Sequence, residues 1–136
     1  MDIIKYEELK EGLKEYNEKL GKPYGNEIVD YPPKNYASPN TIFIEVRNNA
    51  TSFNSCFDRV ASVGYRVEIY AKTKNKIDKQ KIAREIAYYV DLFLTSKGLN
   101  RVSFNPNPNF NNSDGAIYGL IMMYEGSLHE NRSKII

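Results

Sequence analysis

Apolar and polar residues alternate along two stretches of the chain, and a period of two is typical of β-strands whose faces differ. The first stretch is Thr41 to Arg47, and the second is Tyr65 to Ala71. Residues 53–63 fit either a helical turn or a bent strand that continues through Gly64, and we favour the strand, with Gly64 at a bulge. The pattern therefore predicts two strands in the first half of the chain.

Two other stretches carry apolar residues at steps of three and four, the spacing of an amphipathic helix. One runs from Asp2 to Leu20, and the other follows the second strand and ends at Gly98. Asn75 or Asp78 can cap the start of the second helix, because a short side-chain oxygen accepts a hydrogen bond from the amides of the first turn. Gly98 can close its end, because the left-handed conformation costs glycine no side-chain clash.

The remaining segments supply two more strands and two long connections. Residues 99–105 and 116–124 read as strands, and the loop 105–115 between them is rich in asparagine and proline, so we expect it to project from a hairpin. Residues 22–40 hold four prolines and cannot form a helix. Either residues 27–31 hide a short edge strand or this segment is a functional arm, and both alternatives stay open.

These elements predict an α+β fold: a mainly antiparallel, four- to five-stranded sheet with two helices packed on one face, in the order α-β-β-α-β-β. We place the fold in one domain of residues 1–126, which includes the 22–40 arm and the 105–115 loop. Residues 127–136 are polar for most of their length, and we expect a mobile tail there.

The strand at 116–124 is apolar on both faces, so it needs two covers, whereas helices on one face of an antiparallel sheet leave the other face open. We therefore expect an exposed apolar sheet face that acts as a subunit interface. Its expected members are Phe43, Tyr70, Tyr118, Leu120 and Met122. The alternative is that the proline-rich loop of the same chain folds over this face.

Composition changes this picture mainly by disfavouring certain partners. The net charge is +2, and Lys and Glu are mixed along the chain, which disfavours a specific nucleic-acid ligand because phosphate binding needs clustered cations. The charged amino terminus does not fit a signal peptide, and residues 115–124 are about half of a membrane span, so we expect no membrane partner. Eleven tyrosines with no tryptophan suit a protein that makes contacts with other proteins.

Candidate chemistry is sparse. Cys56 and His129 are the single cysteine and the single histidine, so an internal disulfide is impossible and a metal site of the usual kind is disfavoured. The sequence holds no glycine-rich phosphate loop, nucleophile elbow or two-histidine metal spacing. Asp114 precedes Gly115 and is typical of a turn. We therefore expect no enzyme, no cofactor and no metal.

A set of structural residues in the carboxy-terminal half carries a family pattern, across about residues 57–128. The set consists of Tyr65-x-Val67-Glu68-Ile69-Tyr70-Ala71, a Lys-rich turn, Ile86-x-x-x-Val90-Asp91, Gly98-Leu99-Asn100-Arg101, Pro108-Asn109, Ala116-Ile117-Tyr118 and Tyr124-x-Gly126. It closely resembles the tail-terminator proteins, also called tail-completion or head–tail joining proteins, of long-tailed bacteriophages and related phage-tail-like particles. Where that family often has arginine, this chain has Gly119 and Met123.

The resemblance implies a hexameric ring that caps the finished tail tube, ends its polymerisation and joins the head connector. It implies a place in the tail–neck region of the virion, and in the host cytoplasm during assembly. The expected partners are further copies of the chain, the tail tube protein, and the head connector or sheath protein. We place the partner contacts on the two long connections, at Tyr31, Tyr36, Asn107, Asn109 and Phe110.

Other functions stay open beside this one. The chain can be another phage neck or tail component, or a small ligand-binding regulatory α+β domain with a defined pocket. The enzymatic rival is a nuclease or toxin, and it would require convergent acids or a histidine in a cleft.

Overall fold

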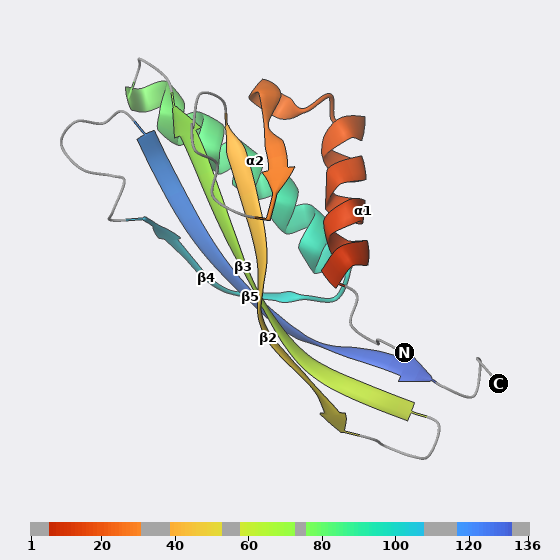
Figure 1. The fold of residues 1–136 in the computed structure, drawn as a ribbon. Coiled ribbons are helices and arrows are strands. Elements are labelled where there is room, and N and C mark those ends of the chain that lie inside the picture. Colours follow the sequence, from red (N-terminus) through yellow and green to blue (C-terminus); the bar gives the residue numbers. More distant parts are fainter. Residues whose placement is uncertain (1–5, 31–38, 53–57, 73–75, 108–116, 132–136) are drawn as a thin grey trace.

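The computed structural model describes residues 6–30, 39–52, 58–72, 76–107 and 117–131, and Figure 1 shows a twisted sheet with both helices on one face. The predicted α+β fold, with a mainly antiparallel sheet, is confirmed. In chain order the elements are α1 (Tyr6–Lys19), the short 3-10 helix η1 (Pro23–Gly25), β1 (Glu27–Val29), β2 (Asn40–Ser52), β3 (Asp58–Lys72), α2 (Lys76–Ser96), β4 (Asn100–Pro106) and β5 (Ile117–Asn131).

The five strands lie in the order β1-β2-β3-β5-β4, and every pair is antiparallel except the parallel pair β1–β2. Strand β1 is the short edge strand that the sequence left as one of two alternatives. Just before it, Asn26 is 1% exposed and bonds to α1 and β2: its carbonyl accepts from Asn17 Nδ2 at 2.8 Å, and its Oδ1 accepts from Thr41 Oγ1 at 3.0 Å. The first part of the 22–40 segment is therefore held by its own chain.

Helix α2 ends through a Schellman motif. The Leu99 amide donates to the Leu94 carbonyl, and the Gly98 amide donates to the Thr95 carbonyl. Gly98 has φ +90°, a conformation that a side chain would strain. The predicted helix stop at Gly98 is therefore confirmed.

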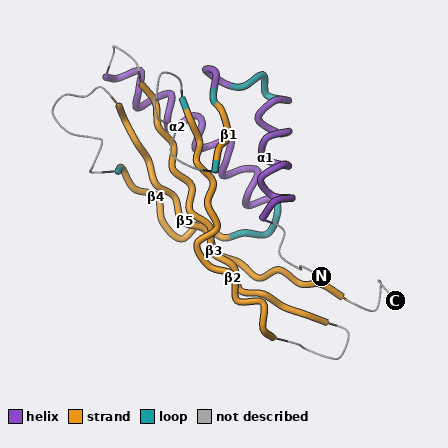
Figure 2. The backbone as a smooth tube through the Cα atoms, viewed as in Figure 1, coloured by secondary structure: helices purple, strands orange, loops and turns teal. Residues whose placement is uncertain are grey.

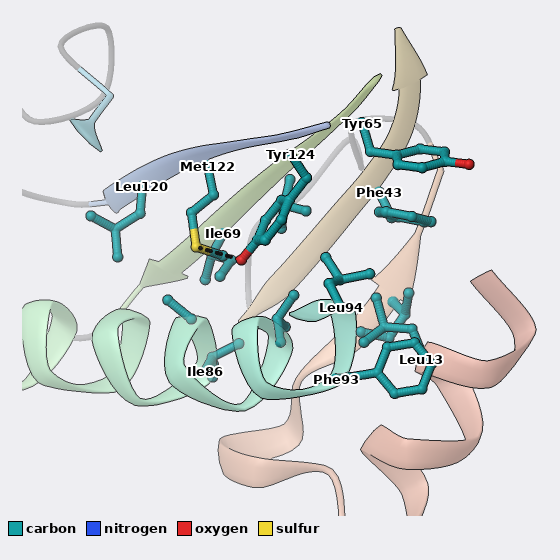
Figure 3. Close-up of a cluster of buried hydrophobic side chains, with 14 of the residues drawn as sticks. Leu13, Phe43, Tyr65, Ile69, Ile86, Phe93, Leu94, Leu120, Met122 and Tyr124 are labelled. Carbon is teal, nitrogen blue, oxygen red and sulfur yellow. Dashed lines mark hydrogen bonds between the residues drawn. The ribbon is translucent and has the colours of Figure 1, made fainter. Parts of the chain in front are cut away.

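The core lies between the helices and the facing side of the sheet, as Figure 3 shows. Leu13 of α1 and Ile86 and Leu94 of α2 are almost completely buried there. Gly12 permits this packing, because a Cβ at that position would lie 2.9 Å from Cζ of Phe93 on α2. The mid-helix glycine that weakens α1 by about 1 kcal/mol thus lets the two helices approach closely.

Strands β2 and β5 are longer than the sequence pattern predicted. Strand β3 begins at Asp58, so the strand favoured for residues 53–63 is confirmed from residue 58 on, while residues 53–57 lie outside the described part. β3 and β5 pair without interruption from Asp58↔Asn131 to Lys72↔Ile117, so the expectation of a mobile tail from residue 127 is wrong for residues 127–131. Residues 132–136 lie outside the described part. The bulge expected at Gly64 occurs in the partner strand, because the register shift between Glu45 and Arg47 lies opposite Gly64.

The far ends of these three strands run past the helix layer, as Figures 1 and 2 show. We call residues 48–52 of β2, 58–62 of β3 and 127–131 of β5 the strand extension. Among the residues whose side chains are described, the helix-packed core ends at Val63 on β3 and Tyr124 on β5, and Figure 1 shows the strands continuing beyond both helices. The strand extension is therefore a three-stranded ribbon that neither α1 nor α2 covers.

Candidate assembly surfaces

Four of the five residues expected on an exposed interface are instead part of the core beneath the helices. Phe43, Leu120 and Met122 are 0% exposed, and Tyr118 is 8% exposed. Tyr6 of α1 stacks on Phe43 with 5.4 Å between the ring centroids, and it donates a hydrogen bond to the Phe43 carbonyl. The prediction that these residues form an exposed apolar face is wrong.

The pairing register explains this error. Phe43 lies opposite Val67, and Val67 lies opposite Met122, so all three side chains point to the same face. Tyr70 lies opposite Gly119 on β5 and belongs to the other face. The five residues therefore never shared one face of the sheet.

The open face of the sheet, opposite the helices, mixes ion pairs with half-buried apolar side chains. Arg66 Nε lies 2.8 Å from Glu68 Oε2, and Arg47 Nη2 lies 3.9 Å from Glu125 Oε2. Gly64 of β3 lies between Arg47 on β2 and Glu125 on β5. Because Gly64 has no side chain, the side chain of Arg47 can pass over β3 toward Glu125. Apolar residues of this face include Ile44, Ile121 and Met123, which are half-buried, and Ile42 and Tyr70, which are buried.

Asn107 was expected to contact a partner, but it is only 3% exposed and binds its own chain. Its amide donates to the Gly119 carbonyl at 2.9 Å, and its Nδ2 donates to the Tyr70 hydroxyl at 2.9 Å. The Tyr70 hydroxyl in turn donates to Glu68. Asn107 therefore continues the pairing of β4 with β5 and holds its side chain against Tyr70 on the open face, and the partner-contact prediction is wrong for Asn107.

Gly119 is required by this packing of Tyr70 and Asn107. A Cβ there would lie 2.7 Å from Cε1 of Tyr70 and 3.3 Å from Cβ of Asn107. Tyr70 has little room to move away, because its hydroxyl is bonded on both sides. This contact explains in physical terms why the chain has glycine where the resembled family often has arginine.

The other residues expected to contact partners, Tyr31, Tyr36, Asn109 and Phe110, lie outside the described residues. Cys56 also lies outside them. His129 lies on β5 in the strand extension, opposite Val60 of β3.

The outer face of α2 carries an aromatic patch that the sequence analysis did not single out. Tyr88 is 61% exposed and Leu92 is 42% exposed, and both point away from the core. Tyr24 of η1 is 49% exposed and donates a hydrogen bond to Glu85 of α2. The signal was present in the sequence, because Tyr88 and Leu92 are four residues apart and fall off the apolar stripe of Ile82, Ile86, Val90 and Phe93.

Asp91, Arg101 and Tyr124, which belong to the quoted family pattern, meet beside the end of α2. The Tyr124 hydroxyl donates to Asp91 Oδ1 at 2.6 Å, and Arg101 Nη1 lies 3.7 Å from the same oxygen. Burial, and then the hydrogen bond to Asp91, raise the pKa of Tyr124 far above its usual value. The tyrosine therefore stays neutral and acts as a donor that ties β5 to α2.

Two further residues of that pattern pack directly beside this cluster. A Cβ on Gly126 would lie 2.9 Å from Cδ2 of Leu99, so the glycine leaves room for the turn after α2. Arg101 also lies over the ring of Phe104, with 5.2 Å from Cζ to the centroid. The cluster thus joins α2, β4 and β5 in a structural contact.

The described residues offer little for catalysis or ligand capture. The hollow between α1, α2 and β1 holds about 10 Å³, which is about the room that one water needs. Two larger hollows, of about 480 Å³ beside Tyr88 on α2 and about 530 Å³ between Arg47, Asn100 and Glu125, are wide open to solvent, unlike the concave sites that bury most of a small ligand. Within the same part of the chain, no group of three or more His, Cys, Asp or Glu could hold a metal ion. Neither of the described helices is long and apolar enough to cross a membrane.

The chain matches no protein-family model, and no curated protein matches its sequence.

Proposed function

We propose that this protein is a structural assembly protein that caps the tail tube of a bacteriophage or phage-tail-like particle. In this role it forms a ring, ends tube polymerisation and provides the joint to the head connector. It acts by contact with other proteins and needs no cofactor.

The observation that supports the proposal most is the convergence of the family pattern in space. Asp91, Arg101 and Tyr124 are up to 33 residues apart in the sequence, yet they form one bonded cluster. Leu99 and Gly126, from the same pattern, are packed against each other nearby. Contacts of this kind are expected of a set of residues that determines a fold, and such a set is what the resemblance rests on.

The surfaces also suit an assembly protein better than a ligand-binding domain. The hollow between the helices and β1 is too small for a metabolite and the larger hollows are open to solvent, while Tyr88, Leu92 and Tyr24 leave apolar side chains at the surface of the helix layer. The strand extension adds an uncovered ribbon of sheet. Aromatic side chains and bare sheet are features that bind other proteins.

The proposal is tested by adding the purified protein to the polymerising tail tube protein of the same particle. We expect shorter tubes, with a ring visible at one end by negative-stain electron microscopy. The Leu120→Lys variant, which we expect to be unfolded, is the control for unspecific effects of added protein. Tubes of unchanged length in the presence of the folded protein would overturn the proposal.

A second measurement separates this role from that of another neck component. Particles made without the protein should carry tails of uncontrolled length if it terminates the tube. Tails of normal length that fail to join heads would instead indicate a neck component that acts after termination.

A further inference from the structure

The outer edges of the strand extension belong to β2 and β5. Strand β1 pairs with β2 only at residues 40–42, and the pairing of β4 with β5 ends at Asn100↔Glu125. Among the described residues, no strand therefore lies beside the outer edge of β2 at 48–52 or beside the outer edge of β5 at 127–131. Such edges present backbone donors and acceptors that can pair with another strand.

The alternation of hydrogen bonds identifies the residues that face outward on β5. The Gly119 carbonyl accepts from the Asn107 amide, on the side of β5 that faces β4. In a regular antiparallel strand every second residue points to the same side. Because β5 pairs with β3 without a register shift as far as Asn131, the backbone groups of Ser127 and His129 point away from β3.

The same reasoning identifies Asn48 on β2. The even-numbered residues of β5 bond to β3, and they lie opposite odd-numbered residues of β3, such as Tyr65↔Tyr124. The even-numbered residues of β3 therefore bond to β2, and Gly64 and Ser62 lie opposite Arg47 and Asn49. Asn48, between these two, faces outward.

The edge of β5 in the strand extension lacks two of the features that protect sheet edges, a register shift and a proline. Strand β4, the edge of the helix-covered part, has a register shift between Arg101 and Ser103 and ends in Pro106, and both features hinder pairing with another chain. Residues 127–131 of β5 have no register shift and no proline. This stretch is suited to accept a further strand.

We propose that the outer edge of β5 at residues 127–131 pairs with the outer edge of β2, around Asn48, on a second copy of this chain. β2 and β5 are both antiparallel to β3, so they run in the same direction and would pair in parallel between copies of like orientation. Three residue pairs suffice for the parallel pairing of β1 with β2 in this sheet, and the regular stretch of β2 from Arg47 to Asn49 offers as many.

A head-to-tail contact is favoured over a contact between two β5 edges. It covers both bare edges with a single kind of interface, whereas a symmetric β5–β5 dimer leaves the edge of β2 uncovered on each copy. A head-to-tail interface closes into a ring or continues as a filament. The inference concerns only the contact between copies, and it holds whether or not the ring caps a tail tube.

Proline variants test this contact with little damage to the sheet, because they remove only an outward-facing amide. Ser127→Pro should disable the β5 edge, and Asn48→Pro should disable the β2 edge. Ser127→Ala and Asn48→Ala remove the same side chains but keep the amides, so they are the matched controls. Far-UV circular dichroism and thermal unfolding check that every variant is folded.

Sedimentation velocity over a range of concentrations gives the readout. We expect the wild type and both alanine variants to assemble beyond two copies, and each proline variant to remain a single copy. A 1:1 mixture of the two proline variants should form a species of two copies, because each variant keeps the edge that the other has lost.

Three results would overturn the proposal. They are a wild type that stays a single copy, a Ser127→Pro variant that assembles like Ser127→Ala, and an Asn48→Pro variant that forms a dimer by itself through β5. If a ring persists in both proline variants, the edge contact is wrong and the proposed function stands. If the prolines act as expected but tube length does not change, the edge contact stands and the proposed function fails.

Discussion

Tyr124 shows how one polar group can fix the position of a strand against a helix. It is 1% exposed, and its hydroxyl donates to Asp91 Oδ1 at 2.6 Å. A hydrogen bond from a buried hydroxyl to a carboxylate is stronger than one between neutral groups. The residue therefore contributes both apolar packing and a directed bond between β5 and α2.

Removal of that hydroxyl should destabilise the protein. We expect Tyr124→Phe to lower the free energy of unfolding by about 1–3 kcal/mol, because the ring still fills its place while the bond to a charged group is lost. The matched control is Tyr88→Phe, since Tyr88 is 61% exposed on the outside of the same helix. That change should be within about 0.5 kcal/mol of the wild type in urea unfolding. Equal effects of the two changes would contradict a structural role for the Tyr124 bond.

The same variant should alter the response of the protein to alkaline pH. Because the pKa of Tyr124 is raised in the folded state, its contribution to stability is present below the unfolded tyrosine pKa of about 10 and is lost as pH rises above that value. Tyr124→Phe should therefore show a smaller loss of stability from pH 9 to pH 11 than the wild type does. This pH comparison separates the raised pKa from a simple packing defect.

Single residues also mark how far a sequence can be interpreted by itself. The helix stop at Gly98 could be predicted, because the chemistry of the motif is local and depends on a few neighbouring residues. The role of Gly119 could not, because it depends on Tyr70 and Asn107, which reach it only through strand pairing. Neither could the Asp91–Tyr124 bond, whose partners lie on different elements.

At the scale of elements, the decisive property is which side of each strand faces the helices. The alternation within a strand is visible in the sequence, and it correctly grouped Tyr118, Leu120 and Met122 on one face of β5. The register between strands is not visible, since it depends on which residues of two distant segments lie opposite each other. Phe43 and Tyr70 were therefore grouped together although they point to opposite faces.

The same substitution at two neighbouring positions of β5 tests the orientation of this strand. Leu120→Lys should unfold the protein, at a cost of about 4 kcal/mol or more, because Leu120 is 0% exposed and a lysine there would bury an unpaired charge. Ile121→Lys should cost about 1 kcal/mol or less, because Ile121 is half-buried on the open face directly opposite Glu68. Urea unfolding of both variants checks this. A folded Leu120→Lys variant would contradict the assignment of the two faces.

At the scale of the whole molecule, the sheet is longer than the layer that covers it. Every second residue of β5 from Tyr118 to Tyr124 packs against the helices. Residues 127–131 continue the strand beyond both helices. The sequence did not predict this, because polar residues after Gly126 are typical of both a frayed tail and an uncovered strand. The pairing with β3, which the sequence of one strand cannot show, makes the difference.

This division of the sheet predicts a graded pattern of amide hydrogen exchange. Protection depends on how often a region opens, and bare strands open more readily than strands packed in a core. In dilute protein we expect the amides at 127–131 to exchange faster than those at 118–124, with Ser127 and His129 fastest because their amides point outward. Nuclear magnetic resonance at a concentration where the chain is a single copy can resolve these residues individually.

On assembly, the outward amides at 127 and 129 should become protected, because the proposed edge contact gives them acceptors on the neighbouring copy. The amides of Leu9 and Leu13 in α1 serve as the internal reference, since α1 lies away from the strand extension and its protection should not change. Mass spectrometry of peptides from the assembled species provides the measurement. Protection that rises in the helices but not at 127–131 would show that copies meet through the helix layer, with Tyr88 and Leu92 as the first residues to examine.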